Sequence, residues 1–302
     1  MTGPDPRVSV VIATNRGGPW LDEAVASVLA QTMDDLELII VDDGVPGGVR
    51  QLAALDDRIR LVAGRQAGIS TARNIGNAAA RGELVAVLDD DDRWMPDKLE
   101  RQLALLDRHP ESAMCHTQFE RIDADGVVIG PGWSSPAGIA ELLAGTAGVL
   151  HSSTLWRKSV LVAVGGYDPG FSRGVDAELL LRVSGTWPSV FDPSVLVQYR
   201  VHRTQTSGSG AYREIFAEVR RVHRKHLPRL AASHPDLPCA ADTVSRRVFA
   251  RIAVDEAVRE VKAGRLVAAL GHGAWVLRTD PVAATRYIGR RGAERARRMW
   301  GG

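Results

Sequence analysis

The first ninety residues alternate between short apolar runs and segments whose apolar residues recur every three or four positions. Continuous apolar, largely β-branched runs occupy residues 8–13, 36–41, 59–62 and 84–88. Such runs are typical of strands that are buried on both faces of a sheet. The segments between them predict helices, and one of these starts at Pro19, a residue that suits the first helical position.

Strands that alternate with helices predict right-handed crossovers and a parallel sheet. We therefore expect an α/β fold with a Rossmann-like, mainly parallel sheet flanked by helices. From Tyr212 onward the pattern is helical, and further helices are expected near residues 244–262, 265–277 and 281–299. The expected domains are residues 1–210, which form the α/β domain, and residues 211–302, which form a helical C-terminal extension.

Three of the four predicted strands end in polar groups that are out of place in a core. The first is followed by Thr14, Asn15 and Arg16, the second by Asp42 and Asp43, and the fourth by the acidic run Asp89, Asp90, Asp91 and Asp92. In parallel sheets, ligands bind beyond the carboxyl ends of the strands. This placement predicts a ligand site at that edge of the sheet.

The acidic run is the strongest single feature. Four consecutive aspartates after a buried strand repel one another in a cleft of low dielectric constant. A divalent cation removes that penalty, and carboxylate oxygens suit Mg²⁺ or Mn²⁺. The alternative is a solvated acidic turn that caps the next helix. Because the run follows an apolar strand and lies near two other polar strand ends, the metal site is favoured.

Composition and charge exclude several function classes. The chain has 38 Lys and Arg against 36 Asp and Glu, so it is not a polycation built for nucleic acid. Two cysteines cannot form a disulfide framework, which favours a reducing compartment. The first residues lack the features of a secretory signal, and no stretch is long and apolar enough to span a bilayer. We expect a cytoplasmic protein, soluble or peripheral at the inner face of the membrane.

An ordered series of segments resembles the family-2 glycosyltransferases of the GT-A fold. The series runs from about residue 8 to residue 209 and consists of VSVVIATNR, LELIIVDDG, GISTARNIGNAAARGELVAVLDDDDRWMPDKLERQ, HSSTLWRKSVLVAVGGYD, VDAELLLRVS and YRVH. The resemblance implies an inverting, metal-dependent enzyme that moves a sugar from a nucleotide-diphosphate sugar, most commonly a UDP-sugar, to an acceptor hydroxyl. A glycan, a lipid-linked molecule and a small molecule all remain open as the acceptor.

The resemblance assigns the first two polar strand ends to the nucleoside of the donor. Thr14, Asn15 and Arg16 match the wall of the nucleoside pocket. Asp43, with Asp42 behind it, matches the acid that contacts the base or the ribose.

The diphosphate and the metal are assigned to the next segments. Arg73 and Asn74 match the start of a nucleotide-binding helix, where arginine can reach phosphate or stack on a base. The alternative for Arg73 is an exposed helix residue. Asp89, Asp90 and Asp91 match the Asp-x-Asp element. Asp91 is then expected to bind Mn²⁺ or Mg²⁺ directly, and Asp89 to contact the ribose or the metal.

The second half supplies the expected base and one further ligand. Asp176 matches the family's general base, although its place before a predicted helix also suits an N-cap. Val175 stands where the family usually has a second acid. His202 matches a histidine that joins the metal or diphosphate site, and residues 203–210 are polar and Gly/Ser-rich, as in a mobile lid. A purely structural histidine is the alternative.

Other functions stay open. A sugar nucleotidyltransferase shares the sheet and the metal chemistry but needs a Gly-rich, Arg-containing phosphate loop, which residues 14–18 do not supply convincingly. A dinucleotide oxidoreductase needs G-x-G-x-x-G after the first strand, and this motif is absent there. A non-catalytic nucleotide-sugar-binding protein would retain the same donor residues. The Arg-rich segment 281–299 suits an anionic membrane surface, and equally a homodimer contact or a solvated helix.

Overall fold

The computed structural model describes residues 5–143, 147–202, 204–205, 212–232 and 237–281. The chain divides into two compact units. The first ends at Arg203 and the second begins at Thr204, apart from residues 143–145, which group with the second. The domain boundary predicted after residue 210 falls among residues 206–211, which lie outside the described residues.

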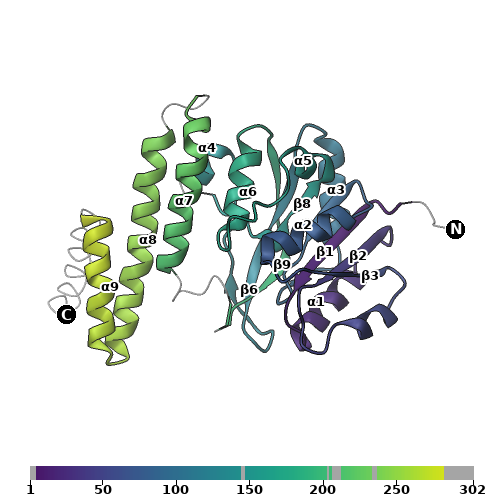
Figure 1. The fold of residues 1–302 in the computed structure, drawn as a ribbon, viewed down its shortest axis with the longest axis horizontal. Helices are drawn as coiled ribbons and strands as arrows, with labels where there is room; N and C mark the ends of the chain where they lie inside the picture. Colours follow the sequence, from purple (N-terminus) through teal and green to yellow (C-terminus); the bar gives the residue numbers. More distant parts are fainter. Residues whose placement is uncertain (1–4, 144–146, 203, 206–211, 233–236, 282–302) are drawn as a thin grey trace, which may run out of the picture. The chain divides into compact units, whose positions relative to one another are not determined.

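The first unit is built on one sheet (Figure 1), whose nine described strands follow the order β3-β2-β1-β4-β8-β6-β9-β5, with β7 paired to β6. The four apolar runs form β1 (Val8–Thr14), β2 (Leu36–Asp42), β3 (Ile59–Ala63) and β4 (Leu84–Val87). All four pair in parallel, as predicted. The other strands are β5 (Arg93–Trp94), β6 (Met114–Ile122), β7 (Val128–Pro131), β8 (Leu155–Arg157) and β9 (Ser189–Arg200).

The second half of the sheet is mixed. β8 lies between β4 and β6 and runs antiparallel to both, while β6 and β9 pair in parallel. β9 is one continuous strand of 12 residues that contains Pro193. Its pairing with β6 shifts register between Thr117 and Gln118, opposite Pro193. This irregularity accommodates a proline, which cannot donate to the ladder.

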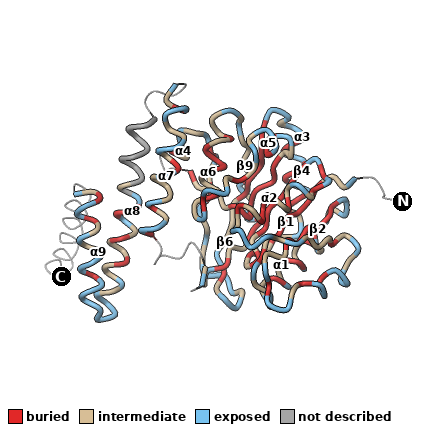
Figure 2. The backbone as a smooth tube through the Cα atoms, in the orientation of Figure 1, coloured by how far each residue is buried: buried red, intermediate tan, exposed pale blue. Residues whose placement is uncertain are grey.

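Helices cover both faces of the sheet. α1 (Pro19–Leu29) and α3 (Lys98–Arg108) contribute to a core with the strand residues Val10 and Leu38. α2 (Ile69–Ala79) packs on the opposite face, where a Cβ at Gly76 would lie 2.4 Å from Val11. Figure 2 shows that the buried residues are concentrated in the strands between these layers. The shorter helical segments are η1 (Arg50–Ala54), α4 (Ile139–Leu143), η2 (His151–Ser153), α5 (Lys158–Ala163) and α6 (Val175–Ser184). The predicted α/β class is confirmed.

The second unit contains three described helices, α7 (Tyr212–Leu230), α8 (Leu237–Lys262) and α9 (Leu266–Thr279). Phe216, Phe249 and Val276 bring one residue from each helix into a shared apolar core. The helical C-terminal region is therefore confirmed, whereas the helix predicted for residues 281–299 lies outside the described residues from 282 onward. None of the described helices has both the length and the apolar character that crossing a membrane requires.

Candidate functional site

The polar ends of three neighbouring strands lie together at one edge of the sheet. β1 is flanked by β2 and β4, and all three run in the same direction. The hydroxyl of Thr14 donates to Asp90 Oδ2 at 2.5 Å, and the backbone N–H of Asp43 donates to the Thr14 carbonyl at 2.7 Å. The parallel pairing therefore brings the predicted strand-end groups to one place.

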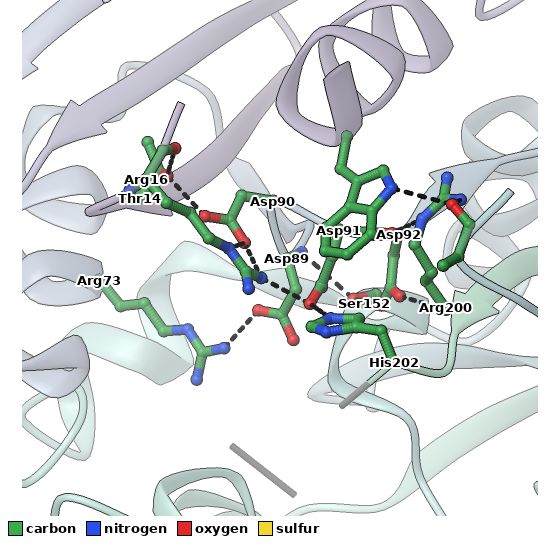
Figure 3. A network of polar contacts seen from close by, with 12 residues as sticks. Thr14, Arg16, Arg73, Asp89, Asp90, Asp91, Asp92, Ser152, Arg200 and His202 are labelled. Carbon is green, nitrogen blue, oxygen red and sulfur yellow. Dashed lines mark hydrogen bonds and ion pairs between the residues drawn. The ribbon is translucent and has the colours of Figure 1, made fainter. Parts of the chain in front are cut away.

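Arg16 reaches across this edge to two of the aspartates (Figure 3). Its Nε and Nη2 lie 3.0 Å and 2.5 Å from Asp90 Oδ1, and its Nη2 lies 2.5 Å from Asp91 Oδ2. Burial lowers the pKa of the Arg16 guanidinium. The hydrogen bonds and charges of Asp90 and Asp91 raise it by a larger amount, so the net pKa lies above its ordinary value. Arg16 is thus a permanently charged group between two carboxylates.

Arg73 neutralises the first aspartate of the run. Its Nη2 donates to Asp89 Oδ1 at 2.5 Å, and its guanidinium carbon lies 5.5 Å from the centre of the Tyr167 ring. Burial raises the pKa of Asp89, yet the charge and hydrogen bond of Arg73, together with the charges of His151 and Arg16, outweigh it and the net pKa is lowered. Only 7% of the Arg73 side chain is exposed, so the alternative that it is a surface helix residue is wrong.

Asp92 is buried within the protein. It accepts a 2.5 Å hydrogen bond from the Ser152 hydroxyl and a 2.9 Å hydrogen bond from the Arg200 backbone N–H. Burial, reinforced by the charges of Asp91 and Asp89, raises the pKa of Asp92 well above its usual range. The next helix, α3, begins only at Lys98. The alternative that the acidic run is a solvated helix-capping turn is therefore wrong.

His202 follows β9 and contacts the same aspartate as Arg16. Its Nε2 lies 2.8 Å from Asp91 Oδ2, and 3% of its side chain is exposed. The Trp20 ring lies against the imidazole, with ring centroids 4.4 Å apart. The structure thus brings His202 to the acidic run, as the resemblance implied, and its role as a metal ligand stays a prediction.

Sequence reasoning missed three residues that support this cluster. The Arg200 side chain is fully buried and donates to Glu23 Oε2 at 2.5 Å and to the Asp91 carbonyl at 2.9 Å. Its guanidinium carbon also lies 5.5 Å from the Trp20 ring centre. Trp20 and Glu23 come from the first turns of α1, where their spacing carries no chemical signal. Arg200 lies in the YRVH segment that the resemblance had singled out.

Asp176 lies near Arg73 but is not paired with it. Its negative charge contributes an upward shift to the pKa values of Arg73, His151 and Tyr167, although burial makes the net shift of His151 downward, so its carboxylate shares their electrostatic environment. Among the described residues, none forms a hydrogen bond or an ion pair with the Asp176 carboxylate. The N-cap of α6 is Gly174, so the alternative that Asp176 caps this helix is wrong.

A buried His–Tyr pair lies beside Arg73. His151 Nε2 and the Tyr167 hydroxyl are 2.6 Å apart. Burial, aided by the charge of Arg73, lowers the pKa of His151 to about 4. Asn74 fixes this turn by bonding both the N–H and the carbonyl of Tyr167, at 2.8 Å and 2.7 Å. Gly166 is required beside it, because φ is +68° and a Cβ would lie 2.4 Å from Asn74 Oδ1.

The residues predicted to contact the nucleoside lie at the ends of β1 and β2. Asp42 Oδ1 accepts hydrogen bonds from the backbone N–H groups of Gly44 and Val45. Asp43 Oδ1 accepts hydrogen bonds from the N–H groups of Arg65 and Gln66, and thereby joins two loops at this edge. Asn15 is exposed. These carboxylates organise the loops, and their contacts with a nucleoside remain predictions.

The predicted metal ligands are only partly assembled. In the part of the chain that the structure describes, no three His, Cys, Asp or Glu side chains lie close enough together to hold a metal ion. Asp91 and His202 do lie together, whereas Asp89 pairs with Arg73.

Comparison with known proteins shows what this chain is similar to. Residues 9–142 match the family model described as glycosyl transferase family 2. An uncharacterized glycosyltransferase of Rickettsia typhi is 29% identical over 215 residues, which cover 68% of this chain and 67% of the relative. The putative teichuronic acid biosynthesis glycosyltransferase TuaG of Bacillus subtilis is 39% identical over 131 residues, covering 42% of this chain and 52% of the relative. The chain spans only 21% of the length of a glycosyltransferase of Rickettsia felis, to which it is 35% identical.

The fold can also be compared with solved structures. The crystal structure of S. aureus TarS 1–349 in complex with UDP-GlcNAc matches with a TM-score of 0.57 and 12% identity, covering 95% of this chain and 92% of that one. This likeness shows the fold alone. Taken with the family match, it shows a GT-A-like fold in which residues 9–142 carry a domain that matches glycosyltransferase family 2.

Proposed function

We propose that this chain transfers a glycosyl group from a UDP-sugar to an acceptor hydroxyl, with inversion and with help from Mn²⁺ or Mg²⁺. The observation that carries the proposal is the arrangement around Arg73, which has the strand-end carboxylate of Asp89 as its partner and the unpaired carboxylate of Asp176 nearby. A uridine donor is supported by the TarS structures, which were solved with UDP and with UDP-GlcNAc.

The residues at the acidic run fit a hard divalent cation. Asp91 Oδ2 and His202 Nε2 are 2.8 Å apart, so one ion can be bound by both. Two protein ligands suffice for Mg²⁺ or Mn²⁺, since such ions commonly complete their shell with phosphate oxygens and water. When bound, the cation would neutralise the charge of the diphosphate leaving group.

The chain's own residues supply the remaining chemistry. Arg73 is held in place by Asp89 and gives a positive charge next to the diphosphate, where negative charge develops as the sugar leaves. Asp176 takes the proton from the acceptor hydroxyl as the new bond forms, a role for which its carboxylate is free. One base with no second carboxylate assigned as a nucleophile supports a single displacement, which inverts the anomeric carbon.

A thermal-shift screen of nucleotide sugars with and without Mn²⁺ tests the donor and the metal together. We expect UDP and UDP-sugars to raise the melting temperature more strongly when Mn²⁺ is present. Release of UDP by slow donor hydrolysis then separates an enzyme from a non-catalytic nucleotide-sugar-binding protein. A sugar nucleotidyltransferase would instead release pyrophosphate from a nucleoside triphosphate and a sugar phosphate. If no nucleotide sugar stabilises the protein with or without Mn²⁺, the proposed function is wrong.

We also propose that the second unit contacts an anionic membrane, which would bring the enzyme to lipid-linked acceptors. The predicted membrane segment, residues 281–299, is not described beyond Pro281, but α9 adds support. Leu266, Val267, Leu270 and Leu277 are 62%, 85%, 74% and 56% exposed, and they share one stripe of the helix. Arg278, in the last turn of α9, adds positive charge to this helix, as in helices that lie on anionic lipid. A homodimer contact through the same stripe is the competing outcome.

A further inference from the structure

One carboxylate oxygen of the acidic cluster, Asp91 Oδ2, has two nitrogen neighbours, one from a guanidinium group and one from an imidazole ring. Asp91 Oδ2 lies 2.5 Å from Arg16 Nη2 and 2.8 Å from His202 Nε2. Figure 3 shows both side chains pointing at this carboxylate from different elements, the loop after β1 and the segment after β9. Arg16 therefore contacts the same oxygen to which a cation between Asp91 and His202 would bind.

Arg16 and a cation cannot both hold that oxygen in the same way. The guanidinium is permanently charged, and a metal ion within bonding distance of Asp91 Oδ2 would be repelled by it. Conversely, the carboxylates of Asp90 and Asp91 are only 10% and 13% exposed, so they need a positive partner when no cation is bound. Arg16 satisfies that need in the structure described here.

The Arg16 side chain has room to move. It is 37% exposed and is attached to a loop rather than to a strand or helix, whereas Asp90 is fixed independently by the Thr14 hydroxyl at 2.5 Å. The guanidinium carbon lies 6.0 Å from the Trp20 ring centre, which gives one apolar wall along which it can turn. Its release from Asp91 would leave the rest of the cluster in place.

We propose that Arg16 is an exchangeable counter-ion: it neutralises Asp90 and Asp91 before the donor binds, and it moves from Asp91 to the diphosphate when the donor and cation arrive. This inference rests on the proposed function and adds a diphosphate ligand to it. It assigns Arg16 a role different from the nucleoside-pocket wall implied by the family resemblance.

Two binding measurements on the full chain test the exchange. Mn²⁺ binding without nucleotide is followed by the electron paramagnetic resonance of free Mn²⁺, and UDP binding at saturating Mn²⁺ is followed by calorimetry. For Arg16→Gln we expect Mn²⁺ to bind about tenfold more tightly and UDP about tenfold more weakly, because a charged hydrogen-bonding partner is lost in each case. Arg16→Lys keeps the positive charge but lacks the planar guanidinium with its several N–H donors. The dissociation constants for Mn²⁺ and for UDP should therefore both lie between those of Arg16→Gln and the wild type.

The opposite signs identify the exchange. Loss of a merely structural residue would weaken both ligands, and Mn²⁺ affinity that is unchanged or weaker in Arg16→Gln overturns the inference. Should Arg16→Gln fail to fold, Arg16→Lys carries the same two comparisons. Arg81→Gln is the matched control, since Arg81 pairs with Glu37 at the other end of the parallel strands, and it should change neither constant. If the wild type binds UDP equally well with and without Mn²⁺, or does not bind UDP at all, the proposed function itself is wrong.

Discussion

The imidazole of His202 lies against the indole of Trp20, with ring centroids 4.4 Å apart, while its Nε2 lies 2.8 Å from Asp91. The Trp20 N–H donates to the Ala124 carbonyl at 3.0 Å, so the indole is itself anchored. Trp20 thus acts on the acidic run only through the side chains that rest on it. This makes it a positioning residue whose effect can be separated from direct contact with a ligand.

We therefore predict that Trp20→Leu weakens Mn²⁺-dependent UDP binding by about tenfold, because stacking on an aromatic face contributes about 0.5–2 kcal/mol. Trp20→Phe should stay within about threefold of the wild type on the same grounds. Calorimetry on Trp20→Leu, His202→Gln and the double variant gives the coupling. If Trp20 acts through His202, the double variant binds no more weakly than His202→Gln alone, whereas additive losses would contradict this.

Asp176→Asn should leave donor binding within about twofold of the wild type, yet lower turnover by about 10²- to 10⁴-fold, the usual loss when a general base is removed. UDP release from the UDP-sugar, with water as acceptor, measures turnover even while the acceptor is unidentified. Asp97→Asn is a suitable control, because Asp97 lies before α3 and its side chain is 48% exposed. Unchanged turnover in Asp176→Asn would remove Asp176 from the role of base.

Lys98 gives the protein a pH-dependent stability. Its side chain is buried, its Nζ lies 2.6 Å from Gln102 Oε1 and 3.9 Å from the Trp94 ring centre, and burial lowers its pKa to about 7. An unfolded lysine has a pKa of about 10.4. Between these values the unfolded chain binds more protons, so the Lys98 contribution to stability rises with pH by up to about 1.4 kcal/mol per unit.

Lys98→Met should remove this slope. We expect urea unfolding between about pH 7 and pH 8.5 to show that the free energy of unfolding of the wild type, relative to that of the variant, increases as pH rises. The range stops there because burial raises the pKa of Cys115 to about 12, and that group destabilises the fold at higher pH. Lys262→Met, on an exposed lysine, should show no such trend. Parallel curves for wild type and Lys98→Met would refute the prediction.

The exposed stripe of α9 predicts binding to anionic vesicles. Replacing both Leu266 and Leu270 with serine should lower co-sedimentation with phosphatidylglycerol vesicles by about tenfold or more, since each buried methylene group contributes about 0.8 kcal/mol. Val162→Ser is the control, because Val162 is 71% exposed on α5 in the first unit. Loss of a dimer in analytical ultracentrifugation, with vesicle binding unaffected, would instead favour a contact between two copies.

The first half of the fold follows closely from the sequence. Buried parallel strands have continuous apolar runs, so the four predicted strands agree with β1 to β4 within one residue at each end. β6 was not predicted, because it contains the polar residues His116 and Thr117, which are nevertheless buried. Their burial depends on partners distant in sequence, and a local pattern of polarity does not contain that information.

The site shows the same division. The acidic run was recognisable because carboxylates directly after an apolar strand must lie at the edge of the sheet. The sequence did not reveal the partner of each carboxylate, because the partners are distant in sequence. Arg73 lies 16 residues before Asp89, and Arg16 lies 75 residues before Asp91. Trp20 supports the cluster by its ring face, and nothing in its sequence position distinguishes it from a core residue.

The cluster is close to electroneutral before any ligand arrives. Five carboxyl groups and four guanidinium groups meet there, namely Glu23, Asp89, Asp90, Asp91 and Asp92 with Arg16, Arg73, Arg200 and Arg93, whose Nη1 lies 3.2 Å from Glu23 Oε2. With five carboxyl groups against four guanidinium groups, the two signs nearly balance. A nucleoside diphosphate would add negative charge that this set does not offset. Under the proposed function we therefore expect the donor to bind together with a cation, and its apparent affinity to depend on the concentration of that ion.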